Sequence, residues 1–195
     1  MYPVNEIFHS LQGEGYNTGT ASVFVRLSGC NLHCSFCDTD HAQHTMMSAE
    51  QIAAEVVRYP QSPLIVLTGG EPALHVDEVL IRALKSTGQR IAIETNGTRP
   101  LPSGIDWITL SPKGAFAGGD NLPCVLDHCD ELKVVYTGQD LSQYDHIHAT
   151  HRFLQPCFVA DVNKCRANVQ ACIGAVLAHP WWRLSLQTHR LTGIK

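Results

Sequence analysis

The chain has no long apolar run and no excess of positive charge. No hydrophobic stretch approaches the roughly 20 residues that a membrane-spanning helix needs, and the first residues lack the basic start and apolar run of a signal peptide. The 14 Lys and Arg against 18 Asp and Glu give a formal net charge of −4, so no basic face for nucleic acid is expected. These absences favour a cytoplasmic protein that acts on a small molecule, without a nucleic-acid or membrane partner.

Internal repeats, low-complexity tracts and linkers are also missing. At 195 residues with 44% hydrophobic content, the chain is long enough for one well-buried core, and we expect a single domain over residues 1–195. Short β-rich runs recur between Gly- and Pro-containing turns. They predict strands over residues 22–27, 64–67, 90–94, 106–110, 131–136, 152–155 and 183–187.

Long helical patterns are fewer. A capping box of Ser48 and Gln51 opens a predicted helix over 48–58, and a second apolar stripe runs over 76–86. A third helix is expected from near Asp161 to just before Pro180. Its apolar stripe contains Cys165, Val169, Cys172, Ile173, Val176 and Leu177. Because the later connections are too short for regular helices, we expect an α/β fold whose parallel sheet curves into a partial, incomplete β/α barrel.

Three cysteines lie within eight residues of one predicted loop. Cys30, Cys34 and Cys37 have the spacing C-x3-C-x2-C, and no fourth cysteine lies nearby. Three thiolates leave one corner of a [4Fe-4S] cluster open for a small molecule. With His33 or His41 they could instead bind zinc, so a noncatalytic metal-binding module is an alternative.

Polar or glycine-rich motifs directly follow five of the predicted strands. They are the cysteine loop, TGGEP at 68–72, TNGT at 95–98, SPK at 111–113 and Pro156. Because the carboxyl ends of parallel strands meet at one end of a barrel, we expect these motifs to form one site. Gly69 and Gly70 would let backbone approach a ligand closely, and Ser111 and Lys113 could hold a carboxylate.

The cysteine spacing, followed one β/α unit later by GGEP, resembles the radical S-adenosylmethionine (SAM) superfamily. In that superfamily three cysteines hold a [4Fe-4S] cluster whose fourth iron is chelated by SAM. The resemblance implies that Cys30, Cys34 and Cys37 are the cluster ligands. It implies a SAM site formed by Phe36, Cys37, Asp38, Gly70, Glu71, Ser111, Pro112, Lys113, Gln155 and Pro156.

Motifs over nearly the whole chain narrow this resemblance. They are NEIFHSLQGEG, FVRLSGC, CDT, TGGEP, ETNGT, SPK, LQP and SLQTHRLTGIK. Together they resemble the 7-carboxy-7-deazaguanine synthase family, Mg-dependent radical SAM lyases of queuosine and deazapurine biosynthesis. Members contract 6-carboxy-5,6,7,8-tetrahydropterin to 7-carboxy-7-deazaguanine with loss of ammonia. The resemblance also implies a homodimer and a flavodoxin-like electron donor; Cys157 and Phe158 depart from the family pattern.

The same resemblance assigns the pterin site. Its residues would be Leu11, Gln12, Gly13, Glu14, Arg26, Thr68 and His189. The Gln12 amide could donate to and accept from the guanidine-like edge of the pterin, and Arg26 could form a fork to its carboxylate, unless it is an ordinary surface arginine. Glu94 is a candidate for proton transfer. Thr39 is the family's Mg²⁺ position, and the flanking aspartates could support the ion or merely cap the loop.

Other functions remain open at this level. A radical SAM activase that makes a glycyl radical on a partner protein would share the cysteine loop and GGEP. The remaining cysteines at 124, 129 and 157 match no paired ligand motif, so we expect them to be structural. The histidines at 146, 148 and 151 are expected on a polar surface segment.

Overall fold

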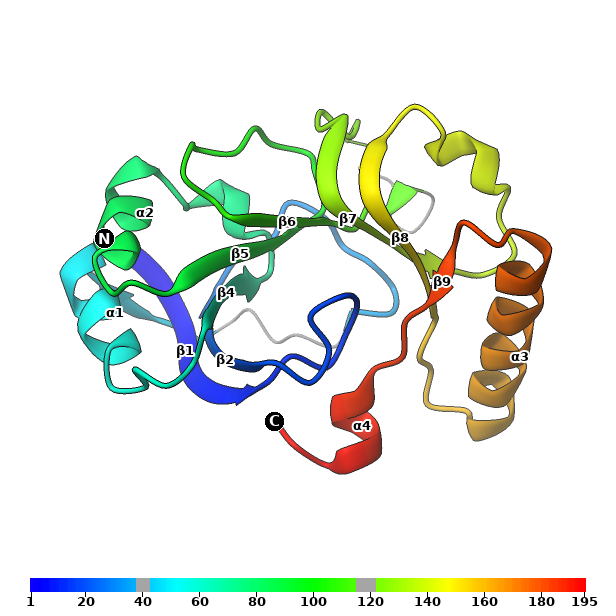
Figure 1. The fold of residues 1–195 in the computed structure, drawn as a ribbon, viewed down its shortest axis with the longest axis horizontal. Helices are drawn as coiled ribbons and strands as arrows, with labels where there is room; N and C mark the ends of the chain where they lie inside the picture. The colour runs from blue at the N-terminus through cyan, green and yellow to red at the C-terminus, as the bar shows by residue number, and fades with distance from the viewer. Residues whose placement is uncertain (38–42, 115–121) are drawn as a thin grey trace.

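The computed structural model describes residues 1–37, 43–114 and 122–195. Within these ranges the framework is a nine-stranded sheet with the order β3-β1-β2-β4-β5-β6-β7-β8-β9 (Figure 1). The strands are β1 (Tyr2–Leu11), β2 (Ala21–Leu27), β3 (Thr45–Met47), β4 (Leu64–Gly69), β5 (Arg90–Thr95), β6 (Trp107–Leu110), β7 (His128–Tyr136), β8 (His148–Pro156) and β9 (Arg183–Leu184). Seven of them coincide with the predicted strands.

The parallel part of the sheet runs from β2 to β9, and every neighbouring pair in it is parallel. The sheet curves around an interior (Figure 1). In the described part of the chain the edge strands β3 and β9 do not pair with each other, so the barrel stays open. The predicted partial β/α barrel is therefore confirmed.

Two antiparallel strands were not predicted. β1 pairs with β2 from Val4 opposite Leu27 to Leu11 opposite Ala21, and β3 pairs with the start of β1. Polar residues within β1 obscure the alternation that marks a strand, and β3 has only three residues. The strand expected over 183–187 is present, but it is shorter than predicted: β9 has two residues and lies at the edge of the sheet.

All the helices except the last cover the outside of the sheet, and the short last helix lies at its open side, next to the cavity (Figure 1). The helices are α1 (Ala49–Val56), α2 (Glu78–Lys85), α3 (Val162–Ala178) and α4 (Thr188–Thr192), with short 3-10 turns at Pro72–Leu74 and Leu141–Tyr144. The predicted capping box of Ser48 and Gln51 is present at α1, and Asp161 caps α3. α4 was not predicted, since five residues without a side-chain cap carry little helical signal.

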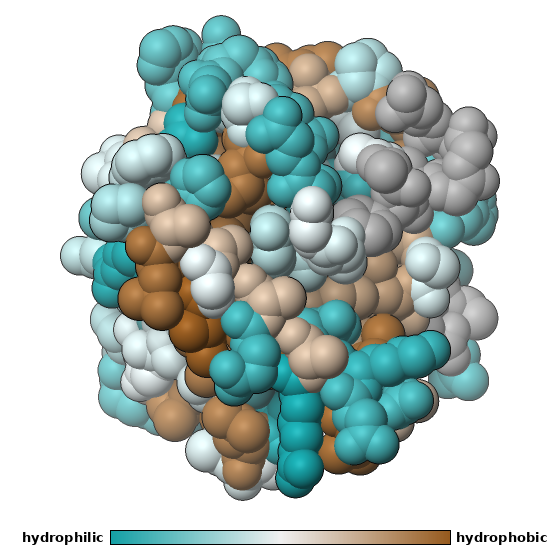
Figure 2. All heavy atoms as spheres, turned by 90° about the vertical axis from the view of Figure 1, so that its right-hand side faces the viewer, coloured by the Kyte–Doolittle hydropathy of each residue, from teal (hydrophilic) through white to brown (hydrophobic). Residues whose placement is uncertain are grey.

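The apolar stripe predicted for α3 is only partly right. Cys172 and Ala175 are buried against the sheet, whereas the side chain of Leu177 is 79% exposed. α3 packs mainly against β8 and β9 at one edge of the sheet, so it buries a narrow strip rather than a full face. On the side of the molecule where α3 lies, hydrophobic areas of the surface alternate with hydrophilic ones (Figure 2).

The hydrophobic core holds the strand ends that form the site. One cluster joins β2, β4 and β5 to α1 and α2, with fully buried residues such as Leu27, Leu67 and Leu80. A second joins β6, β7 and β8 to α3 around Leu132 and Trp182. No helix in the described ranges is long and apolar enough to cross a membrane.

Candidate active site

A cavity of about 290 Å³ lies at the carboxyl ends of the parallel strands. Most of the residues predicted for the site line it. They are Leu11, Gln12, Gly13, Glu14, Arg26, Cys30, Cys34, Phe36, Cys37, Thr68, Gly70, Glu71, Glu94, Ser111, Lys113, Gln155, Pro156 and His189. Pro112 is not part of the lining, and Asp38 and Thr39 lie outside the described residues. Cys157 and Phe158, which depart from the family pattern, line the cavity as well.

The two glycines of the GGEP loop pack against the backbone of the cysteine loop. A Cβ atom on Gly70 would lie 2.0 Å from the carbonyl oxygen of Gly29, and one on Gly69, whose φ is +129°, would lie 2.0 Å from that of Leu27. The Gly70 and Glu71 amides donate to Leu27 and Gly29 at 3.0 and 2.9 Å. No larger residue fits there, because the close approach is to backbone that cannot move aside.

Glu71 joins the loop after β4 to the loop after β5. Its buried carboxylate accepts hydrogen bonds from the Thr95 hydroxyl at 2.7 Å and from the Asn96 and Ala73 amides at 2.6 and 2.9 Å. Burial raises the pKa of Glu71, and these donors oppose the rise. The carboxylate is thus a structural bridge beneath the predicted SAM site, a role that the motif alone does not indicate.

Three thiols from one loop face the same cavity. Cys30 and Cys34 are half-buried, burial raises their pKa, and the Lys113 ammonium partly offsets the rise at Cys34. Among the described residues no three His, Cys, Asp or Glu side chains are close enough to hold a single metal ion. A zinc ion would need its ligands in one tight shell, whereas a [4Fe-4S] cluster binds each thiolate through a different iron. The three-thiol donor set therefore fits the cluster, and His41, a candidate ligand of the alternative zinc site, lies outside the described residues.

Lys113 lies beside this loop. Its ammonium donates to the Ser111 hydroxyl at 2.9 Å and lies 5.6 Å from the centre of the Phe36 ring. Burial lowers the pKa of Lys113, and the nearby Lys133 charge lowers it further. Three of the residues predicted for SAM are thus adjacent in space, with a donor pair that suits a carboxylate.

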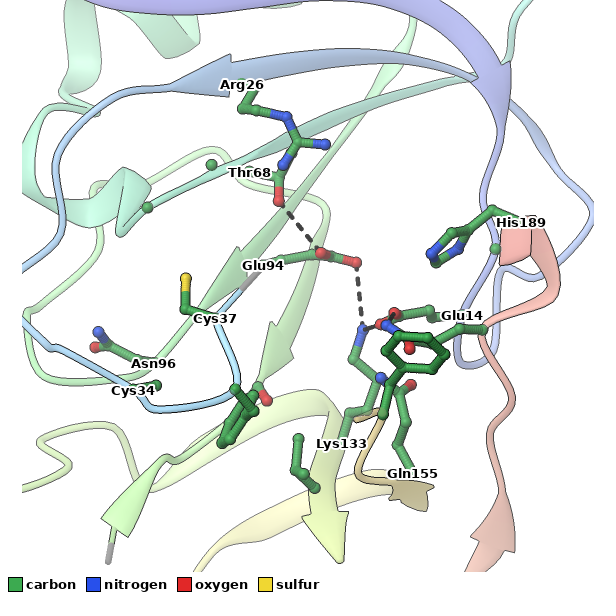
Figure 3. Close-up of a pocket in the computed structure, with 18 of the residues that line it drawn as sticks. Glu14, Arg26, Cys34, Cys37, Thr68, Glu94, Asn96, Lys133, Gln155 and His189 are labelled. Atoms are coloured by element: carbon green, nitrogen blue, oxygen red, sulfur yellow. Dashed lines mark hydrogen bonds and ion pairs between the residues drawn. The ribbon is translucent and has the colours of Figure 1, made fainter. Parts of the chain in front are cut away.

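The opposite wall carries a network of charged and amide groups (Figure 3). Glu94, at the end of β5, accepts hydrogen bonds from the Gln12 amide at 3.0 Å and the Thr68 hydroxyl at 3.3 Å. The Lys133 ammonium donates to Glu94 at 3.4 Å and to Glu14 at 2.5 Å. Gln12, Glu14, Thr68 and Glu94 were all predicted for the substrate side, and one lysine connects them.

Lys133 is the main site residue that the sequence analysis missed. Burial would lower its pKa, but the carboxylates of Glu14, Glu94 and Glu131 raise it, so the ammonium stays charged. Burial would raise the pKa of Glu14, but the Lys133 charge and hydrogen bonds from Lys133 and Gln187 lower it to about 2. The signal was present: Glu131 and Lys133 are two residues apart in a strand where they alternate with Leu132 and Val134, so both side chains lie on the same face of β7.

Arg26 lines the cavity at the end of β2, and its side chain is 25% exposed. Its Nε donates to Glu6 at 2.9 Å, and in Figure 3 it lies on the same side of the cavity as Thr68 and Glu94. The structure thus places Arg26 in the wall of the site rather than on an outer strand surface.

The C-terminal segment closes one side of the cavity. The Thr188 amide and hydroxyl both donate to the carbonyl of Gly13 at 2.9 Å. His189 packs so closely on this hairpin that a Cβ on Gly13 would lie 2.3 Å from its Nδ1. Gln187, Arg190 and Lys195 also line the cavity, so the segment after β9 contributes more than the predicted histidine.

Comparisons with known proteins match this architecture. The model of the radical SAM superfamily matches residues 24–117. A 7-carboxy-7-deazaguanine synthase from Bacteroides thetaiotaomicron is 52% identical over 195 residues, covering 100% of both chains. The enzyme of that name from Bordetella pertussis is 40% identical over 216 residues, covering 99% of both chains.

A solved structure supports the same assignment. The crystal structure of QueE from Escherichia coli superposes with a TM-score of 0.76 and 30% identity, covering 95% of this chain and 93% of that one. The matched regions span nearly the whole chain and therefore include the segments that line the cavity. The chain therefore belongs to the 7-carboxy-7-deazaguanine synthase family of radical SAM enzymes.

Proposed function

We propose that this protein converts 6-carboxy-5,6,7,8-tetrahydropterin to 7-carboxy-7-deazaguanine with release of ammonia, as a carbon–nitrogen lyase. One observation carries the proposal. A single cavity has three cluster-type thiols at one end and, at the other, an arginine beside an amide–carboxylate network. The first set suits radical chemistry, and the second suits a ligand with a carboxylate and a guanidine-like edge.

On the substrate side, each group has a defined task. The Arg26 guanidinium binds the substrate carboxylate, because its planar fork matches a planar anion. Glu94 and Gln12, which are hydrogen-bonded to each other at 3.0 Å, form hydrogen bonds with the donors and acceptors of the pterin edge. Glu94 is also placed to accept or return a proton during the rearrangement.

At the other end, Cys30, Cys34 and Cys37 hold a [4Fe-4S] cluster, and Ser111, Lys113 and the GGEP backbone hold SAM. When bound, cluster and SAM together supply hydrogen-atom abstraction by a carbon-centred radical. The protein would orient the substrate's reacting C–H bond toward the cysteine end of the cavity, and the segment carrying His189 would keep water and competing hydrogen donors away.

Magnesium completes the proposed cofactor set. Thr39, outside the described residues, is the candidate ligand, and hard Mg²⁺ would take its hydroxyl together with substrate oxygens and water. We expect Thr39→Ala to reduce product formation while the iron content of the cluster stays unchanged. Wild-type turnover that persists after rigorous removal of divalent metal would contradict the magnesium proposal.

The experiment that tests the function is a product assay. The protein is reconstituted anaerobically with iron and sulfide, then given SAM, Mg²⁺, a reductant and 6-carboxytetrahydropterin. We expect 7-carboxy-7-deazaguanine and ammonia in equal amounts, with SAM regenerated. Formation of 5′-deoxyadenosine without pterin product would contradict the proposal and favour another radical SAM activity, such as activation of a partner protein.

The family also supports expectations about the working state. We propose that the enzyme acts as a single-domain homodimer in the cytoplasm and takes electrons from a flavodoxin-like protein. Sedimentation of the reconstituted protein and reduction by purified flavodoxin test the two interactions.

A further inference from the structure

Glu6 does not line the cavity, but it pairs with Arg26 and Lys195, which do. Its Oε1 accepts a hydrogen bond from Arg26 Nε at 2.9 Å, and its Oε2 pairs with the ammonium of Lys195. The Glu6 side chain is 26% exposed. Burial would raise its pKa, but Lys195 and Arg26 lower it, so Glu6 is an anion at neutral pH.

A β-bulge brings Glu6 to this position. Val4 lies opposite Leu27, but Glu6 lies opposite Arg26, so β1 has one extra residue between these pairs. Without it, Glu6 would lie opposite Val25. The bulge shifts the register by one residue and aligns the carboxylate and the guanidinium as a directly opposed cross-strand pair. The local irregularity of β1 thus has a specific result at the site.

The contact determines which edge of Arg26 faces the cavity. A guanidinium binds a carboxylate in a bidentate manner either through Nε and one Nη or through its two Nη atoms. Because Glu6 occupies Nε, only the Nη1–Nη2 edge is left for a second anion. Neither of these atoms hydrogen-bonds to any other described residue. Arg26 therefore presents one defined edge rather than two alternatives.

Further contacts hold Arg26 and Lys195 in place. The Arg26 guanidinium lies 5.7 Å and the Lys195 ammonium 4.8 Å from the centre of the Phe8 ring, which itself stacks on Phe24 at 4.9 Å. The Ser10 hydroxyl donates a hydrogen bond to the main-chain oxygen of Lys195 at 2.8 Å. Arg26 and Lys195 thus share the Glu6 carboxylate, which holds both cations in place.

We propose that Glu6 is a positioning residue that sets the carboxylate specificity of the site by fixing the edge of Arg26 that meets the substrate. The inference rests on the proposed function, because it needs a substrate carboxylate at Arg26. It predicts that the loss of Glu6 weakens recognition of the carboxylate and leaves recognition of the pterin ring intact.

The test compares two stable ligands that differ only in the anion. Reconstituted protein with SAM is titrated by equilibrium dialysis with pterin-6-carboxylate and with pterin, and the ratio of their Kd values measures carboxylate preference. We expect Glu6→Ala to reduce this ratio about tenfold while the Kd for pterin changes less than about twofold, since tenfold corresponds to about 1.4 kcal/mol. Glu6→Gln should restore most of the preference, because its amide oxygen still accepts the hydrogen bond from Nε.

Matched variants separate the possible outcomes. Glu55→Ala removes another arginine-paired carboxylate, one that is exposed on α1 and paired with Arg58 at 2.7 Å, and should leave the ratio unchanged. If the wild-type protein does not prefer the carboxylate, the proposed substrate fails. If the wild-type protein prefers it and Arg26→Ala loses the preference, but Glu6→Ala keeps it, the positioning role alone is overturned. A weaker Kd for both ligands in Glu6→Ala would also overturn it, because it indicates general loosening of β1.

Discussion

The two ends of the cavity are built in different ways. The cysteine end consists of consecutive short loops after β2, β4 and β5, held together by backbone hydrogen bonds and by Glu71. The charged end is assembled from the hairpin after β1, the interior face of β7 and the segment around α4. One end depends on close backbone contact, and the other depends on ion pairs between buried side chains.

The two ends also differ in the function that we propose for them: radical chemistry at the cysteine end and substrate binding at the charged end. At the cysteine end a glycine Cβ would collide with backbone, so the loops leave little room for sequence change. At the charged end, Glu14 reaches Lys133 and Gln187, which are 119 and 173 positions away in the chain. We infer that loss of a group at the first end abolishes SAM cleavage, whereas loss at the second destabilises the fold or alters substrate binding.

The largest effect is expected at the cysteine end. Cys30→Ala, Cys34→Ala and Cys37→Ala should each abolish 5′-deoxyadenosine formation, because each thiolate holds one iron and no other cysteine replaces it. Cys124→Ala is the control, since its thiol donates to the Leu126 carbonyl at 3.3 Å and does not line the cavity, and it should retain SAM cleavage. SAM cleavage by any of the three loop variants would refute the ligand assignment.

The next effect concerns the buried ammonium. Lys133→Met leaves Glu14, Glu94 and Glu131 without their common counter-charge and should reduce the free energy of unfolding by about 3 to 5 kcal/mol. The pKa values of Glu14 and Glu131, which the Lys133 charge lowers, would then rise, so the deficit should grow as pH increases from 5 to 8. Urea unfolding at several pH values measures both.

A surface ion pair provides the comparison for Lys133. Lys85 pairs with Asp106 at 2.5 Å with 39% of its side chain exposed, and Lys85→Met should cost less than about 1 kcal/mol. Equal losses in the two variants would show that the charged end does not depend on its buried lysine.

The same comparison explains what the sequence could predict. The cysteine end is local: each motif directly follows a strand, so strand prediction and the barrel rule bring the motifs together. The charged end depends on long-range contacts that no short pattern encodes, and Lys133 was missed although Gln12, Glu14 and Glu94 were predicted by resemblance. β1 was missed because its bulge and polar residues break the alternation, and the α3 stripe was too wide because periodicity cannot tell how much sheet a helix covers.

A smaller effect is expected for Glu14. Its pKa of about 2 lies below the ordinary value of 4.5, so it stabilises the fold above pH 4.5, and this contribution is lost as pH falls toward 2. Glu14→Gln should cost about 2 kcal/mol at pH 7, and the difference from the wild type should shrink between pH 4.5 and 2. A difference that stays constant over this range would contradict the lowered pKa.

The smallest effect concerns the link between the two ends. The buried Ser185 hydroxyl accepts from the Gly15 amide and donates to Gln155, both at 3.0 Å, and so joins the charged hairpin to the predicted SAM wall. Ser185→Ala should cost about 1 kcal/mol and speed hydrogen exchange at the Gly15 amide, because that donor loses its acceptor. Ser103→Ala, which removes an exposed 3.4 Å contact with Glu78, should change neither. Unaltered exchange at Gly15 would show that the Ser185 hydroxyl does not link the hairpin to the predicted SAM wall.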